Sequence, residues 1–201
     1  MLKKIGSDWG GWIIDTDLIR SNSFVLSAGL AHDITFDLGL LALDNTIKII
    51  GIDPTNSSKN SVNNIPLQFK DRYTHIEKCL YGTKEKIRIG GEASSIINNG
   101  YGELFDTILI NDILDQYDIS ILKMDIEGSE YSCINSINDL KVDQVCIEWH
   151  HWLGDMFTIQ ETLSCIDKIK SFGYTEVVRE SENPPKRYIK ESIFIKSSLI
   201  S

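Results

Sequence analysis

Short apolar runs alternate along the chain with segments whose apolar residues recur at three- and four-residue spacing. The apolar runs predict five strands, at Phe24–Leu30, Thr46–Asp53, Tyr73–Leu80, Ile119–Ile126 and Val142–Trp149. The intervening segments predict three helices, at Ile34–Leu43, Ser129–Leu140 and Thr158–Phe172. Strands separated by helices are typical of a parallel sheet with helices on both faces.

Two later apolar runs, Tyr174–Arg179 and Ile189–Lys196, flank the turn residues Pro184 and Pro185 and predict an antiparallel hairpin. The sequence therefore predicts an α/β fold with a Rossmann-like, seven-stranded, mostly parallel sheet and an antiparallel C-terminal hairpin. The segment 56–64 is rich in Asn and Ser and predicts a loop or a weak helix.

The chain of 201 residues has the length of one domain, so we expect a single domain over residues 1–201. Residues 1–22 precede the first of the alternating strands, and we expect them to form either a packed arm or a lid. Gly10 and Gly11 stand between Trp9 and Trp12 there, which favours neither alternative. Residues 85–112 interrupt the alternation with four glycines and predict an inserted hairpin or loop.

The net charge is −9, and such an acidic chain argues against nucleic acid as the main partner, because nucleic-acid binding depends on neutralising phosphates. No apolar run is long enough to span a membrane, and the N-terminal residues lack the apolar region of a secretory signal. We therefore expect a cytoplasmic protein. The four cysteines form no C-x-x-C pair, which favours buried thiols over a zinc site.

Two strand ends carry residues that suit a nucleotide-like ligand. Gly29 ends the first predicted strand, where a glycine lets the backbone approach a ligand closely. Asp53 ends the second, where a carboxylate can accept hydrogen bonds from a ribose diol. A tight turn at Gly29 and a turn-forming aspartate before Pro54 are the structural alternatives. The two features occur together, which favours binding.

Acidic residues end the fourth and fifth predicted strands. Asp125 lies at the end of the fourth strand and Glu148 at the end of the fifth, and neighbouring strands would bring both carboxylates to the same sheet edge. His150 and His151 follow directly. Such a group can abstract a proton or hold a hard divalent ion, with Asp125 and Glu148 as the ligands. Glu127 precedes a helix and can equally complement the helix dipole.

The stretch LKMDIEGSEY, Leu122 to Tyr131, resembles the signature of the FkbM-type S-adenosylmethionine-dependent methyltransferases. SAGLAHDITFD (from Ser27), GSDWGGW, IGIDPT and EWH also fit one subgroup of that family, and the resemblance extends over nearly the whole chain. Ala31 departs from the subgroup, which has glycine at that position.

The resemblance implies that S-adenosylmethionine is the cofactor and assigns residues to it. The loop of Ser27, Gly29 and Leu30 would hold the methionine end. Asp53 and the adjoining Pro54 would hold the ribose. The turn at Leu80 and Tyr81, after the third strand, would flank the adenine.

The resemblance further implies methyl transfer to a hydroxyl of a sugar or another small molecule, including a glycan acceptor. Asp125, Glu148 and His150 are the candidate catalytic residues, with His150 or Asp125 as general base and Mg²⁺ as an option. The alternatives are a protein methyltransferase, a non-catalytic nucleotide-binding module of the same fold and a nicotinamide oxidoreductase. The missing glycines of the dinucleotide fingerprint count against the oxidoreductase.

Overall fold

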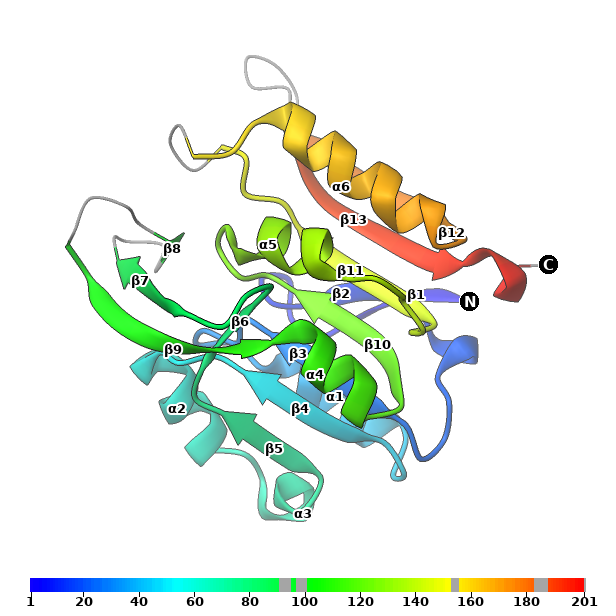
Figure 1. The fold of residues 1–201 in the computed structure, drawn as a ribbon. Helices are drawn as coiled ribbons and strands as arrows, with labels where there is room; N and C mark the ends of the chain where they lie inside the picture. Colours follow the sequence, from blue (N-terminus) through cyan, green and yellow to red (C-terminus); the bar gives the residue numbers. More distant parts are fainter. Residues whose placement is uncertain (91–94, 97–100, 153–155, 183–187, 201) are drawn as a thin grey trace.

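A seven-stranded sheet forms the centre of the molecule (Figure 1). The structure is a computed structural model that describes residues 1–90, 95–96, 101–152, 156–182 and 188–200. The strand order is β12-β13-β11-β10-β3-β4-β5. These strands are β3 (Phe24–Ala28), β4 (Lys48–Ile52), β5 (Tyr73–Ile76), β10 (Ile119–Met124), β11 (Gln144–Glu148), β12 (Tyr174–Glu182) and β13 (Tyr188–Lys196). Strand β13 runs opposite to the other six strands of this sheet, which confirms the predicted fold class.

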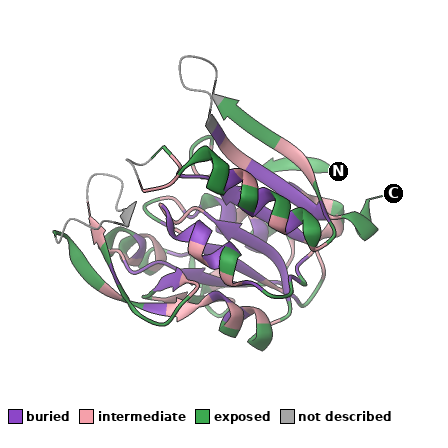
Figure 2. Cartoon of the chain, turned by 45° about the horizontal axis from the view of Figure 1, so that its top comes forward, coloured by how far each residue is buried: buried purple, intermediate pink, exposed green. Residues whose placement is uncertain are grey.

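Three helices cover one face of this sheet (Figure 1). They are α4 (Ile110–Gln116), α5 (Ser129–Ser136) and α6 (Ile159–Ser171). Leu26, Leu122 and Phe194 project from the strands into the apolar core beneath them. Helix α6 lies within one residue of the predicted bounds at each end, and Thr158 and Glu161 form a capping box at its start. Figure 2 shows buried residues running through the central strands and the helix faces against them.

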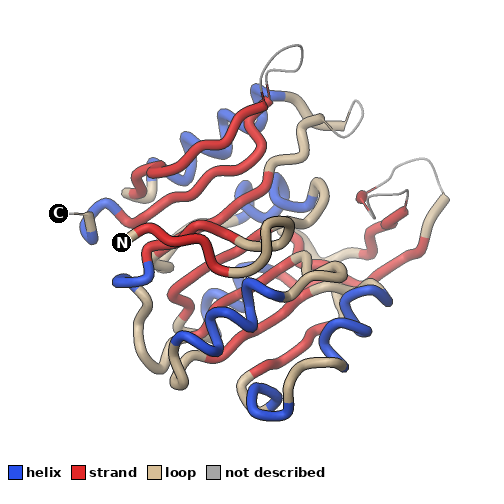
Figure 3. The backbone as a smooth tube through the Cα atoms, turned by 180° about the vertical axis from the view of Figure 1, so that it is seen from behind, coloured by secondary structure: helices blue, strands red, loops and turns tan. Residues whose placement is uncertain are grey.

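Helix α1 (Thr35–Leu43) and an N-terminal hairpin cover the opposite face (Figure 3). The hairpin pairs β1 (Leu2–Ile5) with β2 (Trp12–Asp15). Trp12 and Ile14 are buried in a second core with residues of α1 and of the strands. The side chain of Gln144 on β11 bonds both the N–H and the C=O of Asp15. The hairpin therefore packs on the sheet as an extra layer, and its tip reaches the sheet's carboxyl edge.

Shorter elements complete the fold. Residues 56–64, predicted as a loop or weak helix, form helix α2 (Asn56–Asn63), in which the Thr55 hydroxyl accepts the Ser58 N–H. The chain also contains α3 (Leu67–Lys70), η1 (Thr16–Leu18) and η2 (Ser197–Leu199).

A second sheet of four strands stands beside the first, in the order β6-β9-β7-β8. Its strands are β6 (Cys79–Tyr81), β7 (Lys86–Gly90), β8 (Ser95–Ile96) and β9 (Glu103–Leu109). The strand predicted at Tyr73–Leu80 was wrong in extent. A turn, in which the Lys78 N–H donates to the Ile76 carbonyl over 2.9 Å, ends β5 and sends Cys79 and Leu80 to pair with β9.

Two further boundaries differ from the predictions. In the segment 85–112, predicted as an inserted hairpin or loop, β7 and β9 pair antiparallel, and the last residues already belong to α4. Its residues 91–94 and 97–100 lie outside the described part of the chain, as do Pro184 and Pro185 of the C-terminal turn. Helix α5 ends at Ser136 instead of Leu140: Ile137 is extended, and Ile137 and Leu140 fill the core from a loop.

Candidate functional site

A cavity of about 730 Å³ opens at the carboxyl edge of the main sheet. Its walls come from the tip of the N-terminal hairpin and from segments following β3, β4, β5 and β10, completed by residues at the ends of β11, β12 and β13. Ligands of open α/β sheets bind at this edge, where the carboxyl ends of the parallel strands meet. The cavity thus joins most of the residues that the sequence identified.

The loop after β3 is held in a tight, left-handed shape. Gly29 has φ +77, and a Cβ built there would lie 1.5 Å from the carbonyl oxygen of Asp125, so only glycine fits. Ala31 has φ +44, in the region that favours glycine. The alanine therefore keeps the loop conformation that a glycine would adopt, at some cost in backbone strain.

Asp53 ties this loop to the end of β4. Its Oδ2 accepts the N–H groups of Leu30 and Ala31 over 2.8 and 2.9 Å, and its Oδ1 accepts the Thr55 N–H over 2.7 Å. A carboxylate offers about four acceptor positions, so Asp53 keeps capacity for a ligand hydroxyl.

The residues assigned to the cofactor divide into two groups. Gly29, Leu30, Asp53, Pro54 and Leu80 line the cavity. Ser27 and Tyr81 are absent from the described lining residues: Ser27 lies buried beneath the loop and hydrogen-bonds Asp37. Leu80 and Tyr81 lie on β6 and not in the turn that the sequence predicted.

Lys123 is a buried cation in the cavity wall that sequence reasoning did not single out as a site residue. Its Nζ donates to the Ala28 carbonyl over 3.1 Å and also to the Gly29 carbonyl. It lies 3.9 Å from Asp125 Oδ2 and 5.8 Å from the centre of the Trp12 ring. Lys123 thus fixes the loop after β3 and faces the neighbouring carboxylate. Its place within an apolar strand was the available signal.

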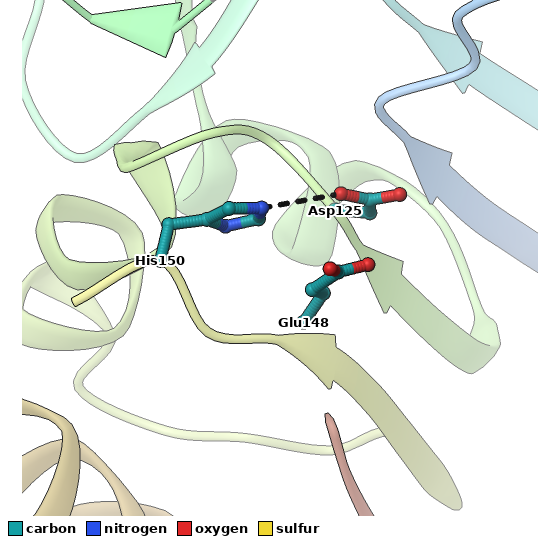
Figure 4. Close-up of side chains that lie close together, drawn as sticks. All are labelled: Asp125, Glu148 and His150. Atoms are coloured by element: carbon teal, nitrogen blue, oxygen red, sulfur yellow. Dashed lines mark ion pairs between the residues drawn. The ribbon is translucent and has the colours of Figure 1, made fainter. Parts of the chain in front are cut away.

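Asp125 and Glu148 lie side by side, as expected for acids that follow the adjacent strands β10 and β11 (Figure 4). His150 Nε2 is 3.6 Å from Asp125 Oδ1. Each of the three residues places one potential ligand atom within 4.8 Å of the others. Burial raises the pKa of Glu148 to about 7, and the negative charge of Asp125 adds to the rise.

His150 is buried, and Glu130 contacts both its backbone and its imidazole ring. Oε1 of Glu130 accepts the His150 backbone N–H over 3.0 Å and lies 3.1 Å from its Nδ1. Burial alone would lower the pKa of His150, but the carboxylates of Glu130, Glu127 and Asp125 raise it to about 10. The imidazole therefore carries a proton at neutral pH.

The sequence did not separate His150 from His151, but the structure does. His151 lies apart from the carboxylates, with its Nδ1 3.1 Å from the Thr162 hydroxyl. Glu130 is fully buried, and sequence reasoning missed it. The available signal was an acid on the buried face of a helix, beside Tyr131 and Cys133.

Glu127 also faces the cavity. Its Oε2 is 3.4 Å from His150 Nε2, and within the described residues this buried oxygen has no hydrogen-bond partner. Burial raises the pKa of Glu127 to about 7, with Asp125 adding to the rise against the opposing charge of His150. Glu127 has φ +51, so its backbone is left-handed.

Residues 3–176 match the family model described as the methyltransferase FkbM domain. The chain belongs to the FkbM methyltransferase family. This family transfers methyl groups from S-adenosylmethionine, which agrees with a cavity at the carboxyl edge of a Rossmann-like sheet. A search of curated protein sequences gave no match.

Solved structures show the same general fold. The fibrillarin pre-rRNA processing protein of Methanococcus jannaschii is similar with a TM-score of 0.51 at 9% identity, covering 90% of this chain and 69% of that one. A precorrin-6y C5,15-methyltransferase of Geobacter metallireducens has a TM-score of 0.47 at 10% identity, covering 88% and 80%. Such low identities indicate fold alone.

Among the described helices, none has the length and apolar character needed to cross a membrane.

Proposed function

We propose that this chain methylates a hydroxyl of a sugar or another small molecule, with S-adenosylmethionine as the methyl donor. One observation carries the proposal: a single cavity joins the loops of Gly29 and Asp53 to the carboxylates of Asp125 and Glu148. A binding end for the donor and a proton-accepting end for the acceptor are thus close together. Positioning of this kind supplies much of the rate in a displacement reaction.

The loops after β3 and β4 suit the donor. Gly29 lets the backbone approach it closely, and the remaining acceptor position of Asp53 suits a ribose hydroxyl. Pro54 and Leu80 add apolar surface on which an adenine ring can pack. When bound, S-adenosylmethionine supplies an electrophilic methyl group on a positively charged sulfur.

The carboxylates suit an oxygen acceptor. A hydroxyl is a weak nucleophile until a base takes its proton, and a base works best when its pKa lies near the working pH. The pKa of Glu148 is raised to about 7, whereas His150 is protonated at neutral pH. We therefore assign the general base to the Asp125–Glu148 pair, with His150 as the cation that orients it.

A divalent ion fits the same residues less well. Asp125 and Glu148 offer carboxylate oxygens, but a protonated His150 has no lone pair for a metal. Mg²⁺ also prefers an octahedron of oxygen ligands. Exhaustive chelation should therefore leave turnover unchanged, and a loss that added Mg²⁺ restores would contradict this assignment.

The outer part of the cavity suits a polar ring-shaped acceptor. Trp9 and Trp152 line it with 83% and 44% of their surfaces exposed, and their faces can pack against the C–H face of a sugar. Glu180, Lys190 and Glu191 add polar groups. The net charge of −9 and these carboxylates disfavour a nucleic-acid acceptor. Because Ala31 preserves the loop shape, its presence gives little support to a non-catalytic module.

The test measures S-adenosylmethionine binding by calorimetry and S-adenosylhomocysteine release with free sugars, glycosides and peptides as acceptors. We expect binding and release with hydroxyl acceptors. Asp125→Asn and Glu148→Gln should lose turnover but keep donor binding, whereas the control Asp115→Asn, at an exposed acid of α4 outside the cavity, should keep both. Unchanged turnover in both test variants would refute the base assignment. Binding without release from any acceptor would favour the non-catalytic module, and release with peptides alone a protein methyltransferase.

A further inference from the structure

Glu127 holds a backbone conformation that residues with side chains rarely adopt. Its φ is +51, and it is followed by Gly128 with φ +104. Left-handed backbone is costly for a residue with a Cβ and persists where the surrounding structure fixes it, often at binding or catalytic positions. The conformation of Glu127 therefore indicates a binding or catalytic role for its side chain.

The start of helix α5 does not account for Glu127. The Gly128 N–H, next to the helix start, donates to Glu130 Oε2 over 2.9 Å. In the described structure, no N–H of the first turn of α5 donates to Glu127. Glu130, and not Glu127, therefore accepts the backbone N–H next to the start of the helix.

The side chain of Glu127 is instead directed to the cavity. Its Oε2 is buried without a hydrogen bond among the described residues and lies 3.4 Å from His150 Nε2. The same nitrogen is 3.6 Å from Asp125 Oδ1, so two carboxylates flank one imidazole. The charge of His150 partly offsets the burial of this oxygen, but no hydrogen bond among the described residues satisfies it, so a ligand that brings a donor would stabilise it further.

We propose that Glu127 binds the acceptor, with its Oε2 accepting a hydrogen bond from a hydroxyl adjacent to the one that is methylated. The inference rests on the proposed function and extends it to a class of acceptor, a polyol with neighbouring hydroxyls. One hydroxyl engages the Asp125–Glu148 pair, and the next engages Glu127. Glu127 therefore selects and orients the acceptor.

A first experiment needs no acceptor. If Glu127 is strained for the sake of a ligand, Glu127→Gly should raise the Tm of the ligand-free protein by about 2–4 °C, the shift expected when about 1 kcal/mol of strain is relieved at this chain length. Asn22→Gly is the control, because Asn22 also has positive φ, 61, at an exposed position. A Tm of Glu127→Gly below that of both wild type and this control would overturn the inference, because it would show a stabilising role.

A second experiment compares methyl glycosides that contain neighbouring hydroxyls with their monodeoxy analogues. The wild type should prefer the diol by about 10- to 100-fold in kcat/KM, the range expected for a hydrogen bond to a charged group. Glu127→Gln should reduce that preference while the Kd for S-adenosylmethionine stays unchanged. A preference that persists in Glu127→Gln would refute the role. If no glycoside is methylated by the wild type, the proposed sugar acceptor fails, and the Tm comparison still decides whether Glu127 is strained.

Discussion

Replacing Ala31 with glycine should stabilise the protein without changing the shape of the loop after β3. Left-handed backbone costs a residue with a Cβ about 1–2 kcal/mol, and Ala31 has φ +44. Glycine also has more conformational freedom in the unfolded chain, and this offsets about 0.4–1 kcal/mol of the stabilisation gained by relieving the strain. The net increase in unfolding free energy is therefore about 0.5–1 kcal/mol, or about 1–4 °C in Tm for a chain of this length.

The measurement is urea and thermal unfolding of Ala31→Gly beside wild type, with calorimetry of S-adenosylmethionine binding. Donor affinity should change little, because Asp53 already holds the Leu30 and Ala31 N–H groups in place. Gly29→Ala is the opposite control: its Cβ would collide with the Asp125 carbonyl, so stability and donor binding should both fall. If Ala31→Gly were less stable than wild type, the strain argument would be wrong.

Three further outcomes follow from buried charges. Glu130→Gln leaves His150 without its partner and should cost about 3–5 kcal/mol in urea unfolding; a loss under 1 kcal/mol would contradict the pairing. Lys123→Met leaves the Gly29 carbonyl without its donor, whereas the Ala28 carbonyl still accepts the Asp125 N–H, so calorimetry should show about 10-fold weaker donor binding; unchanged affinity would refute this role. Burial raises the pKa of Glu176, but hydrogen bonds, chiefly from Arg179, lower it below 4.5. The ionised Glu176 therefore stabilises the folded protein above pH 4.5, and this stabilisation is lost as the pH falls through the lowered pKa. Urea midpoints should therefore fall less in acid for Glu176→Gln than for wild type, and equal falls would contradict the linkage.

The main sheet could be predicted because its strands and helices have different apolar periods. The errors arose where apolar residues pack in other ways. Cys79 and Leu80 were assigned to the same strand as Tyr73–Ile76, but they follow the charged residues Glu77 and Lys78 and pair with β9, whose position no local pattern reveals. Ile137 and Leu140 fit a helical spacing, but they fill the core from a loop.

The sequence could predict those residues of the candidate site that stand at the ends of strands. Asp53, Asp125 and Glu148 end parallel strands, so one edge of the sheet brings them together. Lys123 and Glu130 were missed because their importance depends on what lies opposite them: carbonyl groups in one case and a histidine in the other. Those partners are 94 and 20 residues away in the chain, beyond the reach of spacing arguments.

All four cysteines are free and buried, and they lie in three different parts of the fold. Cys79 lines the cavity, Cys146 lies under the N-terminal hairpin, and Cys133 and Cys165 belong to α5 and α6. Burial raises the pKa of Cys79 to about 12, so its thiol is unreactive until that wall opens. The rates at which a thiol reagent modifies the four side chains would therefore record the order in which the layers separate, with a bound donor slowing the reaction at Cys79 first.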